Sequence, residues 1–306
     1  MNKPRDAANE DLRRTMRRRR TSSPAFPTVP RRGIPLQVTT AELLDVLWRD
    51  YTATTSQAER IHQLLTQRGE ILCNDHIALR TLGAPGIGID ALARPFEAHG
   101  WRPGDRYRYR DRPLRARSWR HDDPALPSVF ISELVLEELS AEAQAQLAAL
   151  IGALPAGLAE RDDLAWSGRP WPVSHATYQA LLAESEYAAW VAAFGFRVHH
   201  FAVDIGSLST FPDLEALDAF LIEHGFALDD TGGVIRGSRA ERLEQSATRV
   251  DAMAVAFSDA TVRIPSCYYE FARRHPHASG ERVHGFAPAS ADRIVESTDA
   301  GISSGG

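Results

Sequence analysis

Three short stretches of the sequence carry side chains that could together bind a metal ion. Each places a potential ligand before an apolar residue and an alanine: His76-Ile-Ala in NDHIALRT, His200-Phe-Ala in HHFAVDI and Glu270-Phe-Ala in YYEFARR. Two imidazoles and one carboxylate form a facial triad, which leaves adjacent coordination positions for substrate and dioxygen. This ligand set suits iron(II) best, although manganese or zinc could also occupy it. The three stretches therefore predict one metal centre formed by His76, His200 and Glu270.

The alternation of side chains along a strand predicts which neighbours share the face of these ligands. Residues two and four apart on a strand project from the same face, so Arg80 is expected beside His76, whereas His199 faces away from His200. The long side chain of Arg80 can reach back to form a bidentate pair with a substrate carboxylate near the metal. The alternatives are a hydrogen-bonded core histidine at position 76 and an ion-paired strand arginine at position 80.

Three further polar residues are candidates for the pocket around the metal. Glu133, in FISEL, occupies the place in the first half of the chain that Glu270 occupies in the second half. It is therefore a competing carboxylate, and whether it contacts metal or substrate is left open. Gln245 and Ser246, in GSRAERLEQSAT, could lie near the same pocket, although nothing in their spacing requires it.

The elements that must position these residues follow the same order twice. In the first half, the strand ILCNDHIALRT is followed by a helix that ends at Gly100 and then by strands, the last of which carries a glutamate. In the second half, the strand FRVHHFAVDI is followed by a helix that ends at Gly225 and then by strands, the last of which is IPSCYYEFARR. His76 to Gly100 spans 24 residues, and His200 to Gly225 spans 25. The repeat predicts an α+β fold of two β-α-β modules around a shared cavity, and chance similarity of short segments is the alternative.

Helices are predicted before and between the two modules. Apolar residues recur at helical spacing over residues 41–68, which predicts a helical segment that stops at Gly69. The insertion between the modules is also predicted to be helical and largely structural. The sequence predicts a disordered basic tail over residues 1–36, one catalytic domain over 37–298 and a flexible C-terminus over 299–306. Within the catalytic domain, module one covers residues 70–136, the helical insertion 137–195 and module two 196–288.

The uneven charge of the chain excludes several classes of function. Of 35 basic and 40 acidic residues, residues 1–32 contain ten and three, which leaves 25 basic and 37 acidic residues and a net charge of −12 for the remainder. An acidic body argues against a nucleic-acid partner, and no apolar run reaches the about 18 residues that cross a membrane. The only lysine, Lys3, lies in the tail, so the body has no Schiff-base or P-loop lysine. Two cysteines favour a reducing, cytoplasmic compartment.

Several longer motifs carry a family resemblance. NDHIALRT, VFISEL, SGRPWPV, TYQALLAESEYAAWVAAFG, LEQSAT and IPSCYYEFARR resemble the compact bacterial members of the 2-oxoadipate dioxygenase/decarboxylase (2-hydroxyglutarate synthase) family, over about residues 41–298. The resemblance implies a vicinal-oxygen-chelate-like mixed-sheet barrel with helical insertions. It also implies Fe(2+) held by His76, His200 and Glu270, with Arg80 binding the substrate. The implied reaction converts 2-oxoadipate and O₂ to 2-hydroxyglutarate and CO₂ in lysine catabolism.

Two other functions are consistent with the same residues. A metal-dependent isomerase or lyase of the same superfamily would act without O₂, and a non-catalytic ligand-binding protein would retain only a vestigial site. Longer family members carry additional C-terminal sequence that contributes to the substrate pocket, so the sequence leaves the exact substrate of this shorter chain open. It also leaves the oligomeric state open.

Overall fold

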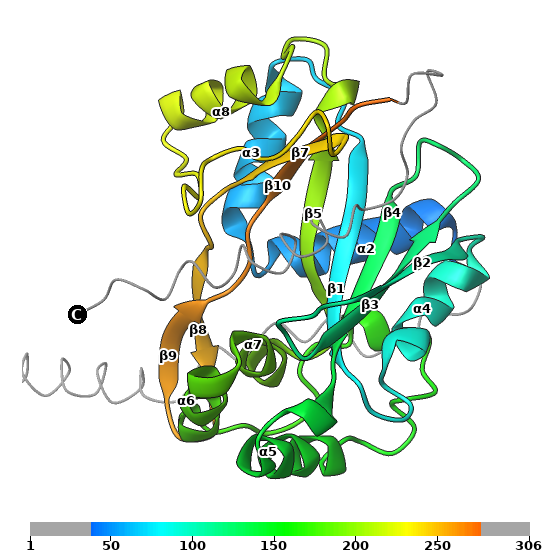
Figure 1. Ribbon diagram of the computed structural model, residues 1–306, viewed down its shortest axis with the longest axis vertical. Coiled ribbons are helices and arrows are strands. Elements are labelled where there is room, and N and C mark those ends of the chain that lie inside the picture. The colour runs from blue at the N-terminus through cyan, green and yellow to red at the C-terminus, as the bar shows by residue number, and fades with distance from the viewer. Residues whose placement is uncertain (1–37, 277–306) are drawn as a thin grey trace, which may run out of the picture. The chain divides into compact units, whose positions relative to one another are not determined.

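The computed structural model describes residues 38–276, in which a central mixed sheet of eight strands carries the predicted ligands (Figure 1). The strand order is β2-β3-β4-β1-β5-β10-β7-β6. The predicted basic tail over residues 1–36 and the predicted C-terminus over 299–306 lie outside the described residues. The strands of this sheet are β1 (Asn74–Leu82), β2 (Arg102–Arg108), β3 (Leu114–Arg120), β4 (Ser128–Leu134), β5 (Val198–Asp204), β6 (Arg236–Ser238), β7 (Leu243–Ala247) and β10 (Glu270–Arg274).

The sheet consists of two halves with the same internal order. In each half the first strand pairs in parallel with the last, β1 with β4 and β5 with β10, and the remaining two strands extend outward. The halves join through antiparallel pairing of β1 with β5. This arrangement confirms the predicted fold class of paired β-α-β modules with a mixed sheet, which here forms a half-barrel. The two central strands are buried along almost their whole length, as expected for strands covered on both faces.

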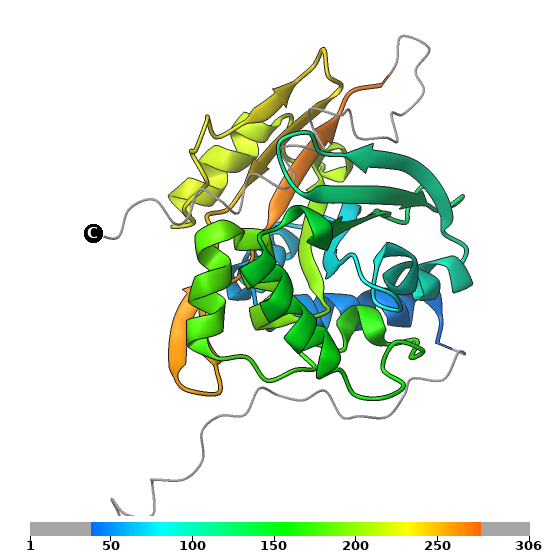
Figure 2. The same ribbon diagram turned by 60° about the horizontal axis from the view of Figure 1, so that its bottom comes forward.

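Helices pack against the sheet and its edges, as Figures 1 and 2 show. Each module contains one helix after its first strand, α4 or α8, and each ends before a glycine in the left-handed region, Gly100 (φ 96°) or Gly225 (φ 83°). The helices are α2 (Thr40–Thr52), α3 (Ser56–Gln67), α4 (Ile89–Ala98), α5 (Ala141–Gly152), α6 (His175–Glu184), α7 (Glu186–Phe194) and α8 (Leu214–Glu223), with short 3-10 helices η1 (Leu136–Glu138), η2 (Leu164–Trp166) and η3 (Ile205–Ser207). In the part of the chain described here, no helix combines the length and apolarity needed to span a membrane.

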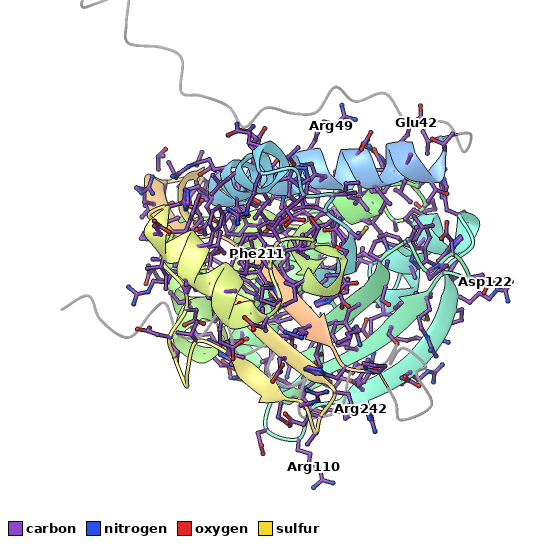
Figure 3. All side chains as sticks on the ribbon, turned by 90° about the horizontal axis from the view of Figure 1, so that it is seen from above. Glu42, Arg49, Arg110, Asp122, Phe211 and Arg242 are labelled. Atoms are coloured by element: carbon purple, nitrogen blue, oxygen red, sulfur yellow. The ribbon has the colours of Figure 1, made fainter. Side chains whose placement is uncertain are left out.

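The predicted helical segment over residues 41–68 is confirmed, but it forms two helices, α2 and α3, rather than a continuous one. A turn over residues 53–55 separates them. The hydroxyl of Thr54 donates a hydrogen bond to the carbonyl of Tyr51 (2.9 Å). This carbonyl therefore has a side-chain partner and does not depend on a further helical turn for its hydrogen bond. The turn lets α2 lie across the outer face of β5, where Leu43, Leu47 and Tyr51 are buried, while Glu42 and Arg49 point outward (Figure 3).

The predicted strand IPSCYYEFARR also divides into two strands. β9 (Thr261–Pro265) pairs with β8 (Ala252–Ala256) in a separate two-stranded sheet, and β10 begins at Glu270 in the large sheet. Proline has no backbone N–H for a further ladder hydrogen bond, so Pro265 is a favourable place for the first strand to end. The five-residue strand β10 then presents Glu270 at its first position.

Candidate metal centre

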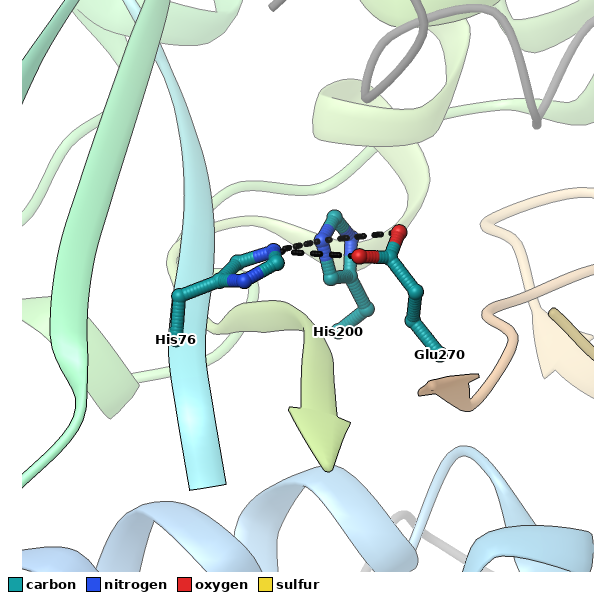
Figure 4. A group of neighbouring side chains, drawn as sticks. All are labelled: His76, His200 and Glu270. Atoms are coloured by element: carbon teal, nitrogen blue, oxygen red, sulfur yellow. Dashed lines mark hydrogen bonds and ion pairs between the residues drawn. The ribbon is translucent and has the colours of Figure 1, made fainter. Parts of the chain in front are cut away.

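Three side chains from distant parts of the chain meet on one face of the sheet (Figure 4). His76 Nε2 lies 3.3 Å from His200 Nε2 and 3.3 Å from one carboxylate oxygen of Glu270, and His200 Nε2 lies 3.8 Å from the other oxygen. One potential ligand atom from each residue lies within 4.8 Å of the other two. All three residues are buried. The structure thus brings together the residues predicted as metal ligands.

The pairing of three neighbouring strands produces this convergence. Ala202 on β5 is the register partner of both His76 on β1 and Glu270 on β10, and His200 is the partner of Ala78 on β1. The three ligands therefore surround small side chains rather than competing large ones. Alanine at these two positions keeps volume free beside the ligands, which a leucine would fill.

The donor atoms fit a single divalent metal ion. Ligands at right angles on an ion with bonds of about 2.1 Å lie about 3 Å apart, which is close to the 3.3 Å separations around His76. Burial lowers the pKa of His200 well below its usual value, so the neutral imidazole that binds metals is favoured. Burial also raises the pKa of Glu270, and a cation beside this carboxylate would stabilise its charged form.

Each ligand has its own polar partner. Asp75 Oδ1 lies 2.9 Å from His76 Nδ1, the Nδ1 atoms of His199 and His200 lie 3.0 Å apart, and the side-chain amide of Gln245 donates to Glu270 (2.5 Å). Such contacts restrict the rotation of the ligands and direct their other polar atoms toward a common point.

The prediction that His199 faces away from His200 is wrong, because the Nδ1 atoms of the two rings are in contact. Ala78 pairs with His200 and Leu79 with Val198, so the pairing of β5 with β1 skips His199 and the strict alternation of side chains is interrupted there.

Arg80 lies on the same face of β1 as His76 and is buried. Its Nη1 donates to the carboxylate of Glu186 (3.1 Å), and its guanidinium lies over the rings of Tyr187 (4.8 Å) and Trp190 (5.6 Å). Burial lowers the pKa of Arg80, but the charge and hydrogen bond of Glu186 together with the nearby Tyr187 and Tyr268 outweigh burial, and the net shift of the pKa is upward. A permanent cation is therefore held in a rigid aromatic environment on the ligands' face of the sheet.

The contacts of Arg80 come from the helical insertion, which was predicted to be largely structural. Glu186, Tyr187 and Trp190 all lie on α7, the helix within that insertion which packs on β1. The hydroxyl of Tyr187 is fixed between β1 and β4, because it accepts from Thr81 N–H (3.1 Å) and donates to the carbonyl of Ser132 (2.8 Å). The sequence signal was a glutamate at the first position of an otherwise apolar helix, a weak signal without knowledge of the packing.

The three further candidates divide between the two faces of the sheet. Gln245 lies on the ligands' face and contacts Glu270. Ser246 lies on the opposite face, where its hydroxyl donates to Asp218 of α8 (2.7 Å). Glu133 also lies on the opposite face, pairs with Arg115 and accepts from the backbone N–H of Ile89 (2.8 Å) at the start of α4. Neither Ser246 nor Glu133 therefore lines the space next to the three ligands.

Comparison with known proteins identifies the family. A family model described as 2-oxoadipate dioxygenase/decarboxylase matches residues 37–155 and 162–284. The chain belongs to this family. It is therefore an enzyme of the dioxygenase class, and the resemblance read from the sequence motifs is confirmed.

Individual relatives agree with this assignment. The 2-oxoadipate dioxygenase/decarboxylase of Arabidopsis thaliana, named as chloroplastic, is 34% identical over 257 residues, with 74% of this chain and 68% of the relative covered. The crystal structure of a Shewanella frigidimarina protein named as a hydrolase is 45% identical, with a TM-score of 0.78 and 81% and 97% of the two chains covered.

Two further solved structures support the fold. The hydroxyglutarate synthase of Oryza sativa, solved in complex with 2-oxoadipate, is 28% identical, with a TM-score of 0.79 and 92% and 98% of the two chains covered. A glyoxalase superfamily protein from Ralstonia eutropha is 22% identical, with a TM-score of 0.67 and 80% and 84% covered. The latter likeness concerns the fold alone and agrees with the predicted vicinal-oxygen-chelate-like architecture.

Proposed function

We propose that this family member uses Fe(2+) to convert 2-oxoadipate and O₂ to 2-hydroxyglutarate and CO₂, in the breakdown of lysine. The observation that carries this proposal is the convergence of the His76, His200 and Glu270 donor atoms within 4.8 Å of one another. Two imidazoles and one carboxylate suit ferrous iron in oxygenases, since they leave positions for substrate and dioxygen. When bound, the iron would supply those positions and the redox chemistry toward dioxygen.

The atoms of this reaction balance without a second reductant. One carboxyl group leaves as CO₂, and the two atoms of O₂ are accounted for by the new carboxylate and the new hydroxyl group. The electrons come from the 2-oxo acid, so no separate 2-oxoglutarate is required. The protein's own residues must therefore position one small substrate.

Arg80 is proposed to bind the carboxylate of the substrate that lies far from the reacting keto group. Its guanidinium shares the face of β1 with His76, four residues further along the strand, which corresponds to about 13 Å between the two Cα atoms. The aromatic rings of Tyr187 and Trp190 fix its orientation. A fixed cation of this kind positions a dicarboxylate by charge and by paired hydrogen bonds.

The choice of 2-oxoadipate rests on a relative. The Oryza sativa hydroxyglutarate synthase, whose whole length is nearly matched by this chain, was solved with 2-oxoadipate bound. A small 2-oxo dicarboxylic acid is thus the substrate class that we propose here.

The direct test is anaerobic loading of the purified protein with Fe(2+), followed by addition of 2-oxoadipate and O₂. Oxygen uptake should match the formation of 2-hydroxyglutarate and CO₂ in equal amounts. A His76→Ala/His200→Ala double variant should lose both bound iron and turnover. A matched His175→Ala/His224→Ala variant removes two histidines on α6 and beyond α8, away from the ligands, and should retain both.

Three results would contradict the proposal. Turnover of a candidate substrate without O₂ would instead support an isomerase or lyase on the same metal site. Retention of iron by the His76→Ala/His200→Ala variant would show that the metal binds elsewhere, and absence of iron from the unaltered protein would support a vestigial site.

A further inference from the structure

We infer that Asp75 and Arg274 are positioning residues for His76, which hold its ring so that Nε2 faces the metal. This inference rests on the proposed function, because it assumes that His76 is a metal ligand. It concerns two residues that lie outside the predicted ligand set and that join the two modules.

The contacts of the pair are direct and enclosed. Asp75 Oδ1 lies 2.9 Å from His76 Nδ1. Arg274 donates through Nε to Asp75 Oδ2 (2.5 Å) and through its Nη2 to Oδ1 (2.9 Å), so the guanidinium holds both carboxylate oxygens. The side chains of Asp75 and Arg274 are 0% and 5% exposed. Little water competes for these hydrogen bonds, which favours a fixed geometry.

The chemistry of the three groups assigns the proton on the imidazole. A guanidinium only donates hydrogen bonds, and a carboxylate held by it only accepts them. The ring nitrogen next to Asp75 must therefore carry the hydrogen when the imidazole is neutral. The lone pair of that neutral ring is then on Nε2, the atom that lies 3.3 Å from both His200 and Glu270. The pair thus selects the tautomer of His76 that can bind a metal.

The strand directions explain why Arg274 reaches Asp75. β10 is parallel to β5, which is antiparallel to β1, so β10 and β1 run in opposite directions. An arginine stands four residues after the ligand on both strands, Arg80 after His76 and Arg274 after Glu270. Because the strands are opposed, one arginine lies beyond the ligands toward the end of β1 and the other lies beside its start. Equal spacing therefore gives different roles.

The pair also borders a pocket at the start of β1. This pocket has a volume of about 240 Å³ and is lined by Asn74, Asp75, Ser128 and Arg274, among others. Asp75 therefore lies between His76 and this pocket. Without the pair, His76 Nδ1 would have a route to solvent from this side, and its ring would lose the partner that fixes it.

The test measures metal affinity and imidazole tautomer rather than turnover. In Asp75→Asn, Arg274 would attract the amide oxygen, and the NH₂ group would then face His76 Nδ1 and favour the tautomer with hydrogen on Nε2. We expect the Kd for Co²⁺, followed by calorimetry and the visible spectrum of the bound ion, to rise about 10- to 100-fold. In the metal-free protein, ¹⁵N NMR of the His76 ring should show mainly the Nδ1–H tautomer in the unaltered chain. In Asp75→Asn, this tautomer should no longer be the major one.

A matched control separates this role from the general loss of a buried charge. Asp218 is a carboxylate of similar burial, but it accepts from Ser246 on the opposite face of the sheet. Asp218→Asn should leave the Co²⁺ affinity within about twofold of the unaltered protein, even if its thermal stability falls. Arg274→Lys keeps the charge but loses the bidentate contact, and it serves as the second variant if Asp75→Asn does not fold.

The outcomes distinguish this inference from the proposed function. If the unaltered protein does not bind Co²⁺, both are overturned. If it binds Co²⁺ and neither Asp75→Asn nor Arg274→Lys changes the affinity or the tautomer, the inference fails while the proposed metal site stands. A weaker affinity with a changed tautomer in Asp75→Asn, and an unchanged affinity in Asp218→Asn, would support it.

Discussion

Replacement of Arg80 tests the proposed substrate geometry most directly. Its Nη1 lies 3.1 Å from Glu186, and its guanidinium lies 4.8 Å from the Tyr187 ring centre, so the group is charged, buried and fixed. Truncation of one partner of a buried charged pair costs about 2–5 kcal/mol. We therefore expect Arg80→Ala to raise the activation free energy with 2-oxoadipate by about 4 kcal/mol, which lowers kcat/KM about a thousandfold. Arg80→Lys keeps the charge but loses the planar stacking and the paired donors. We expect this loss to raise the activation free energy by about 2 kcal/mol, which lowers kcat/KM about 30-fold.

The assay combines this change in the protein with a change in the substrate. 2-Oxohexanoate has the same chain length as 2-oxoadipate but lacks the far carboxylate. The unaltered protein should strongly prefer the diacid, and Arg80→Ala should turn over both compounds within about threefold of each other, because neither can then use the cation. Initial rates of oxygen uptake at saturating iron give the four values of kcat/KM.

The result that would refute this reasoning is an equal loss on both substrates. It would mean that Arg80 supports the fold or the metal site rather than the far carboxylate. Co²⁺ affinity provides the control, since Arg80→Ala should bind the ion as tightly as the unaltered chain. An altered affinity would point to a structural role through α7.

Two further predictions concern stability. Burial raises the pKa of Glu70, but hydrogen bonds from Thr210 and Ser209 outweigh burial and lower that pKa to about 2. The charged carboxylate therefore stabilises the fold fully when the pH is above its ordinary pKa of 4.5, and progressively less as the pH falls toward 2. Glu70→Gln should cost about 2 kcal/mol of unfolding free energy at pH 7, and urea titrations should show that cost falling by more than half at pH 3; a constant difference would contradict the charge-based account. Co²⁺ at 100 times its Kd should add about 2.7 kcal/mol to the free energy of unfolding, which is measurable as a rise in Tm. This rise should be absent in Glu270→Gln and retained in Ser246→Ala. A rise in both variants would place the ion elsewhere.

Strand periodicity was sufficient to predict much of this arrangement. The alternation of side chains placed Arg80 on the face of His76, and the repeated order of strand, helix and strands predicted two paired modules, although not that they join in one sheet. These are local properties, since the two-residue period of a strand does not depend on its neighbours. The break between α2 and α3 was missed because the apolar spacing continues through the turn, whereas Thr54 and its contact with Tyr51 decide where the first helix ends.

Contacts between elements could not be predicted in the same way. The position of Glu186 and Trp190 beside Arg80 depends on how α7 docks on β1, and no periodicity within α7 indicates its partner. Likewise, no sequence pattern indicates a role for Asp75, because its contact with Arg274 joins strands that are almost two hundred residues apart. Register and docking are properties of the assembled core, and one sequence contains them only implicitly.

The register also explains why the two similar modules bring together three proposed ligands rather than four. In the second module, Glu270 is the partner of Ala202, two residues after His200. The equivalent position in the first module is the partner of Ala78, and it is occupied by Phe130, a buried residue whose ring lies 5.3 Å from that of Tyr107. Glu133, which the sequence placed in correspondence with Glu270, is three residues further on and faces α4.

An apolar ring at the fourth symmetric position has a chemical consequence. A second carboxylate there would add a fourth protein ligand and a second buried negative charge, which would favour a closed site with fewer positions for small molecules. Phe130 instead contributes no donor atom. The asymmetry between the modules therefore leaves the two imidazoles and one carboxylate as the proposed ligand set, and such a set leaves positions on one ion for a substrate and dioxygen.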